Sequence, residues 1–194
     1  MTSELIGKIQ REVEMSSARS KFFSGTELAS MIGDAFRIHQ VFPRAPHKDF
    51  CKHEMVPYGV HPAFSALLLL REEFLDTDFR VRGAKALLGH DFLKETTIRE
   101  LDLPDWCKRD GVLKLIRGMM FSKNEDPFKE VWNRGEEVIL LKLYDYTDNL
   151  MNVGTLRSGK SQTERKAHVR ELMAHVRARY RELYVLRIAE ALLK

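Results

Sequence analysis

Hydrophobic residues recur every three to four positions along most of the chain, which is the spacing of one face of an α-helix. The clearest examples are residues 24–38 and the nearly continuous apolar run from Glu136 to about Met151. No segment sustains the strict alternation of apolar and polar residues that a half-buried strand shows. The pattern predicts an all-α fold, with further helices over residues 5–13, 62–74, 78–94, 110–119 and 161–193.

Prolines and capping residues mark the predicted boundaries. Pro43 and Pro46 must interrupt the helix before them, because a proline has no N–H to donate inside a helix. A short helical stretch is expected at 47–52, and Pro62 suits the first turn of the next helix. Capping boxes occur at 96–100 and 161–164. We predict one domain over residues 1–194, with its core at about 24–156 and one long C-terminal helix at about 161–193.

Composition places the protein in the ordinary globular class. Its 194 residues are 44% hydrophobic and 31% charged, which fits one soluble domain. No apolar run is long enough to cross a bilayer, and the segment from Met1 to Glu4 lacks the features of a secretory signal. Cys51 and Cys107 do not make a disulfide framework. We therefore expect a cytoplasmic protein with no membrane partner.

The charge is mildly basic, with 32 Lys+Arg against 28 Asp+Glu and a formal net charge of +4. Lysine and arginine outnumber glutamate from Arg157 to the end of the chain. A basic helix can bind nucleic acid, but Leu172, Val176 and Leu183 also give this segment an apolar stripe. We interpret the basic residues as its solvated side, so nucleic acid is not the expected partner.

Three places along the chain carry groups of the kind that bind metals. They are His61 at a predicted helix start, the adjacent pair His90 and Asp91, and Asp145 with Asp148 one turn later. Two imidazoles and two carboxylates form a ligand set suited to Mn²⁺, Fe²⁺, Zn²⁺ or Mg²⁺.

Each of these residues also has a purely structural interpretation. A carboxylate in so apolar a helix is costly unless it is paired or ligated, but Asp145 could equally form an ion pair with Lys142. His61 could cap a helix or lie at the surface. His168 and His175 share a face of the last helix without a third ligand, and we expect both to be surface residues.

Four segments resemble, in the same order, motifs of the hydrolase domain of RelA/SpoT-type proteins. The motifs are H-x-x-Q-x-R…G-x-P-Y-x-x-H-P, A-L-L-H-D-x-x-E-D-T, L-V-x-G-V-T-K and K-L-A-D-x-x-x-N-L, and the matching segments are residues 47–62, 86–96, 115–123 and 141–150. The ordered set is similar to the HD superfamily of metal-dependent phosphohydrolases. Its Pro-Tyr-x-x-His-Pro element resembles the branch that hydrolyses (p)ppGpp.

The resemblance implies an HD-domain helical bundle that removes the 3′-pyrophosphate from guanosine 3′,5′-bis(diphosphate). The implied metal, by analogy Mn²⁺, would be held by His61, His90, Asp91 and Asp145. Asp148 is the alternative to Asp145, because residues 148–156 also fit the family's D-x-x-x-N-x-x-T-L. The implied substrate-binding residues are Lys52, Lys142 and Asn149.

The chain departs from the family pattern at the acid/base residues. The Glu-Asp pair of the family is Lys94-Glu95 here, and Lys52 stands where the family has arginine. Glu95 would remain as the acid/base group, while Lys94 and Lys52 would contact phosphate oxygens as point charges. These departures keep two alternatives open: hydrolysis of another nucleoside phosphate, or an inactive module that binds nucleotide or nucleic acid.

Overall fold

The computed structural model describes residues 25–42, 50–51, 56–122, 124–151 and 162–194. The helix predicted over residues 5–13 lies outside them. The elements are α2 (Gly25–Val41), β1 (Phe50–Cys51), β2 (Val56–Pro57), α3 (Val60–Leu70), α4 (Thr77–Gly89), α5 (Phe92–Glu95), η2 (Glu100–Asp102), α6 (Asp105–Lys108), α7 (Val112–Met119), α8 (Pro127–Glu130), η3 (Val131–Asn133), α9 (Glu136–Met151), α10 (Gln162–Arg179) and α11 (Tyr184–Leu192). The prediction of an all-α fold is confirmed.

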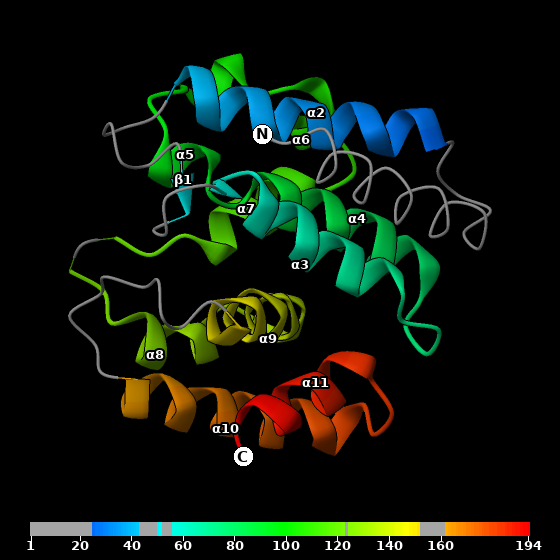
Figure 1. The fold of residues 1–194 in the computed structure, drawn as a ribbon, viewed down its shortest axis with the longest axis vertical. Coiled ribbons are helices and arrows are strands. Elements are labelled where there is room, and N and C mark those ends of the chain that lie inside the picture. The colour runs from blue at the N-terminus through cyan, green and yellow to red at the C-terminus, as the bar shows by residue number, and fades with distance from the viewer. Residues whose placement is uncertain (1–24, 43–49, 52–55, 123, 152–161) are drawn as a thin grey trace.

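The helices are stacked on both sides of α9 (Figure 1). Helices α3, α4 and α7 pack on one side of it, with α2 beyond them, and α10 and α11 pack on the other side. Burial on both sides explains why α9 is apolar around much of its circumference: Leu141, Leu143 and Tyr144 are fully buried, and Leu140 is 2% exposed. Among the described helices, none combines the length and apolarity needed to cross a membrane.

The predicted helix over 78–94 is two helices in the structure. Helix α4 ends at Gly89 and α5 starts at Phe92, so that His90 and Asp91 form the corner between them. Asp91, with φ −97° and ψ −4°, stays in the right-handed helical region and directly precedes the helical turn of α5. The break was not predicted, and it places two adjacent polar side chains at a helix end, where they can point toward one centre.

The prediction of a short helical stretch at 47–52 is wrong for residues 50 and 51, which are the part of that range that the structure describes. Residues 50 and 51 form β1, which pairs antiparallel with β2 so that Phe50 faces Pro57 and Cys51 faces Val56. A proline disfavours helical geometry in the residue before it, so Val56 is extended. The pairing leads the chain into the turn at Tyr58 and Gly59, directly before α3.

The single long helix predicted at about 161–193 is instead α10 followed by α11. Leu183 between them is fully buried and extended, with φ −73° and ψ 139°. The buried carboxylate of Glu72, just after α3, accepts the backbone N–H groups of Tyr184 at 2.7 Å and Val185 at 2.9 Å. These are donors that a helix start leaves unsatisfied, so Glu72 caps α11 from outside and the chain folds back there.

Two basic residues of α10 have structural partners in α11 or directly after it. Arg170 Nη2 donates to the carbonyl of Leu193 at 3.1 Å, and Arg177 lies 3.2 Å from Glu190. Both arginines are exposed to solvent. Their contacts agree with the interpretation of the basic segment as a solvated helical face.

The backbone of α2 lies very close to the start of α3. A Cβ atom built on Gly59 would lie 2.9 Å from the Cα of Phe36, closer than real atoms come. Gly33, on the exposed side of α2, has nothing within 4 Å of such an atom. We predict that Gly59→Ala lowers the free energy of unfolding by about 1–3 kcal/mol through overpacking.

Gly33→Ala is the matched control, and helix propensity should make it more stable by about 0.5–1 kcal/mol. Urea denaturation of the two variants checks both values. Equal stability of Gly59→Ala and the unaltered protein would show that α2 and α3 can separate without cost.

Candidate metal centre

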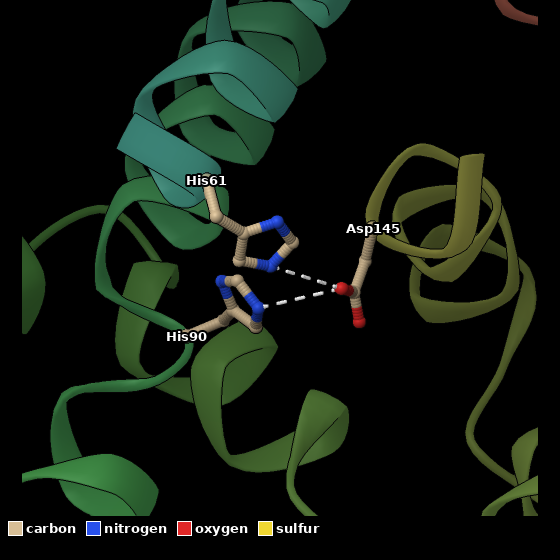
Figure 2. A group of neighbouring side chains, drawn as sticks. All are labelled: His61, His90 and Asp145. Carbon is tan, nitrogen blue, oxygen red and sulfur yellow. Dashed lines mark ion pairs between the residues drawn. The ribbon is translucent and has the colours of Figure 1, made fainter. Parts of the chain in front are cut away.

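Three side chains from separate segments of the chain meet in the interior (Figure 2). His61 lies in the first turn of α3, His90 follows α4, and Asp145 projects from the middle of α9. One ligand atom from each lies within 4.8 Å of the other two. Asp145 Oδ1 is 3.3 Å from His61 Nε2 and 3.7 Å from His90 Nε2. The side chains of His61, His90 and Asp145 are 10%, 3% and 6% exposed.

Both histidines turn the same nitrogen toward this centre. His90 Nδ1 lies 2.7 Å from the carbonyl oxygen of Leu87, to which an N–H at that position donates. His61 Nδ1 faces Asp148 Oδ2 on the edge of the ring opposite to Asp145. In each ring, a proton on Nδ1 leaves the Nε2 lone pair available to a metal.

Asp91 completes the group of four residues predicted as ligands. Its Oδ2 lies 3.3 Å from His90 Nε2 and 3.9 Å from His61 Nε2. The hydroxyl of Tyr58 donates to the same oxygen at 2.7 Å. The structure therefore brings His61, His90, Asp91 and Asp145 to one place, although they come from segments far apart in the chain.

The donor set fits a divalent cation of the first transition row. Ligand atoms about 2.1 Å from a metal lie about 3.0–3.4 Å apart in octahedral or tetrahedral geometry. The separations between the Nε2 atoms and the aspartate oxygens, at 3.3–3.9 Å, are close to that range. Mixed nitrogen and oxygen donors are typical of Mn²⁺, Fe²⁺ and Zn²⁺ sites. The group could therefore hold a metal ion without large rearrangement.

Asp145 is held by two further residues of its own helix. Lys142 Nζ lies 2.8 Å from Oδ2, and Asn149 Nδ2 donates to Oδ1 at 2.8 Å. The side chain of Lys142 is only 7% exposed, and its ammonium lies over the rings of Phe121 and Tyr146. Both residues were predicted to bind substrate. In this structure both bind Asp145, and their contact with a substrate stays a prediction.

Lys94 and Glu95, which stand where the family motif has Glu-Asp, lie at the edge of the centre. Lys94 Nζ is 3.3 Å from Glu95 Oε1 and 3.9 Å from Asp91 Oδ1, and its side chain is 55% exposed. Glu95 is buried. The charge of Asp91 raises the pKa of Lys94 above its usual range, so this rim carries a fixed cation. Lys52 lies outside the described residues.

The charges around the centre shift the pKa values of its aspartates and of His61. Burial alone would raise the pKa values of Asp91 and Asp145, but neighbouring histidine and lysine groups outweigh it and hold both pKa values well below the usual range. Burial would lower the pKa of His61, yet its hydrogen bonds to Asp145 and Asp148 raise it well above normal. A proton on His61 thus supplies positive charge that a bound cation would supply instead, so metal binding is coupled to loss of that proton.

Two residues beside the centre were not predicted from the sequence. Tyr58 is part of the Pro-Tyr-x-x-His-Pro element, but its hydrogen bond to Asp91 depends on the tertiary fold. His39 is fully buried, its ring 4.6 Å from that of Tyr58 and 5.5 Å from that of Phe92, measured between centroids. Among the residues that the structure describes, neither ring nitrogen has a hydrogen-bond partner. A signal was available, because residue 39 continues the core-facing spacing of Leu28, Ile32 and Ala35.

The prediction that His168 is a surface residue is wrong. It is 3% exposed, and its ring stacks on that of Phe128 with centroids 4.1 Å apart. Helix α10 packs against α9, so the apolar stripe of α10 reaches as far as this histidine. His175 is 39% exposed and pairs with Glu136 at 3.0 Å, as a surface residue does.

Comparison with models of known protein families found no match for this chain. Comparison with curated proteins also found no match. The relation to HD-type phosphohydrolases therefore stays a prediction that rests on the four ordered motifs.

The burial of His39 predicts an acid-sensitive fold. Burial, opposed in part by Asp91, lowers the pKa of His39 to about 4 from 6.5. Since the unfolded chain takes up this proton first, stability falls as the pH drops from about 6.5 toward 4. Between pH 7 and pH 5.5, this group should remove about 1 kcal/mol from the free energy of unfolding.

Urea denaturation at the two pH values, with a chelator present, measures the effect. His39→Phe should reduce the loss by that amount, because phenylalanine fills the site and does not titrate. An identical pH dependence in His39→Phe and the unaltered protein would contradict the assignment.

Proposed function

We propose that the protein is a metal-dependent phosphohydrolase that acts on a nucleotide, with guanosine 3′,5′-bis(diphosphate) as the leading substrate. The observation that carries the proposal is the buried group of His61, His90 and Asp145, with Asp91 beside it. The order and spacing of the four family motifs support the choice of reaction.

The metal would be held by the Nε2 atoms of the two histidines and by carboxylate oxygens of Asp91 and Asp145. Such an ion, Mn²⁺ by analogy, supplies Lewis-acid polarisation of a phosphoryl oxygen and lowers the pKa of a bound water. Asp145 is the better fourth ligand than Asp148, because Asp148 lies on the other edge of the His61 ring.

The residues around the centre have distinct proposed roles. Lys142 and Asn149 fix the orientation of Asp145, and Tyr58 fixes that of Asp91. Glu95 is the carboxylate that would take a proton from the attacking water. In the proposed reaction, the water oxygen bonds to phosphorus, the bond between phosphorus and the 3′ oxygen breaks, and that oxygen leaves with a proton.

Lys94 favours a second candidate, a different nucleoside phosphate as substrate. An exposed ammonium at the rim attracts phosphate oxygens, whereas the acid of the family at this position would repel them. The same substitution removes one acid/base group, which is also compatible with a module that binds a nucleotide without hydrolysing it. Product analysis separates these possibilities.

One prediction of this proposal concerns metal content and turnover together. Purified protein should contain about one equivalent of a divalent metal. With Mn²⁺ it should convert ppGpp to GDP and pyrophosphate, as measured by chromatography of the products. The double variant His90→Ala/Asp91→Ala should lose both, because two of the four ligands are gone, while His175→Ala should keep both.

Other outcomes assign the protein differently. Metal without ppGpp turnover, but with release of phosphate or pyrophosphate from another nucleotide in a panel, would move the proposal to that substrate. Full activity in the double variant would contradict the metal centre altogether. Nucleotide binding without turnover of any nucleotide would favour the alternative in which the protein is an inactive module that binds nucleotide.

A further prediction of this proposal concerns Lys94. If its ammonium contacts substrate phosphate, Lys94→Ala should raise KM about tenfold with a smaller change in kcat, since a charge-assisted hydrogen bond is lost. Lys114→Ala, which removes an exposed lysine on α7, should leave both constants unchanged. Steady-state kinetics on the nucleotide that is turned over checks this. An unaltered KM in Lys94→Ala would remove Lys94 from the substrate site.

A further inference from the structure

Each of the two ring nitrogens of His61 faces a carboxylate. Nε2 faces Asp145 Oδ1 at 3.3 Å, and Nδ1 is hydrogen-bonded to Asp148 Oδ2. Asp145 and Asp148 lie one turn apart on α9, so a single helix presents both carboxylates to the same ring. All three side chains are nearly inaccessible to solvent, with exposures of 10%, 6% and 4%.

The two carboxylates cannot act in the same way. A metal ligated by both histidines lies on the side of their Nε2 atoms, where Asp145 is and Asp148 is not. A neutral imidazole offers Nε2 to a metal only when its proton is on Nδ1. An acceptor at Nδ1 selects that tautomer, and a negatively charged acceptor also strengthens the ring as a donor.

We propose that Asp148 is a positioning residue, which holds the His61 ring in the tautomer and orientation that turn Nε2 toward the metal centre. The role rests on the proposed function, since it assigns Asp148 to the support of the same centre. It replaces the alternative in which Asp148 is itself a ligand. It also distinguishes the two histidines, because the Nδ1 partner of His90 is a backbone carbonyl that mutation cannot remove, whereas that of His61 is a side chain.

The test measures the binding of Mn²⁺ alone and of Zn²⁺ alone by calorimetry to the full chain. Asp148→Leu removes the acceptor and should weaken binding about 100-fold, and Asp148→Asn keeps an uncharged acceptor and should weaken it about tenfold. Asp145→Asn changes a ligand and should weaken binding more than either. One metal per chain should still bind to Asp148→Asn.

Tyr144→Phe is the control for a purely structural effect. It removes a buried hydrogen bond from the same helix, that of the Tyr144 hydroxyl to Glu72, without touching His61. It should lower the melting temperature and leave the metal affinity unchanged. A loss of affinity in Tyr144→Phe equal to that in Asp148→Asn would show that Asp148 acts only through the stability of α9.

Long-range ¹H–¹⁵N NMR of the zinc-loaded protein supplies a readout other than affinity or turnover. His61 should carry its proton on Nδ1 and its metal on Nε2, and Asp148→Asn should keep this pattern. Metal on Nδ1 of His61, or unaltered affinity in Asp148→Leu, would overturn the inference while leaving the metal centre intact. Failure of the unaltered protein to bind either metal would instead overturn the proposed function, and this inference with it.

Discussion

The centre of this molecule depends on compensating the negative charge of four carboxylates that are buried around two histidines. Asp91, Glu95, Asp145 and Asp148 are each less than a tenth exposed, and an ionised carboxylate away from water is stable only beside compensating charge or hydrogen-bond donors. The surrounding structure provides both. Lys94 and Lys142 bring charge, Tyr58 and Asn149 bring donors, and His61 is bonded on both edges.

This demand for positive charge links the fold to the proposed chemistry. The helices meet where carboxylates and cationic groups partly neutralise one another, and the negative charge that is left suits a divalent cation. Lys94 gives this rim a positive charge where the motif that the segment resembles has an acid, so under the proposed function a phosphorylated ligand would meet a cation first. Selectivity among phosphorylated ligands would then be decided at the rim, separately from the groups that hold the metal.

Much of the fold and of the centre could be predicted from the sequence because local patterns carry that information. The apolar spacing of residues 136–151 predicted α9 to its bounds, and the ordered motifs predicted which histidines and aspartates would converge. The break of the helix at His90 has no marker such as proline in the local sequence. The cap that Glu72 provides for α11 depends on Tyr184, which is distant in the chain. For His39 the helical spacing indicates burial, but its place beside Tyr58 depends on the tertiary fold.

The bond between Glu72 and α11 has a consequence for how the molecule opens. The Glu72 carboxylate binds the start of α11 and also accepts the hydroxyl of Tyr144, the residue next to Asp145. Detaching α11 alone would strand a buried carboxylate with two of its donors gone, which costs far more than the fraying of an ordinary terminal helix. The end of the chain therefore belongs to the same cooperative unit as α9, and amide hydrogens in both should exchange with solvent in one concerted opening. A ligand that steadies Asp145 would slow exchange in a helix that it never touches.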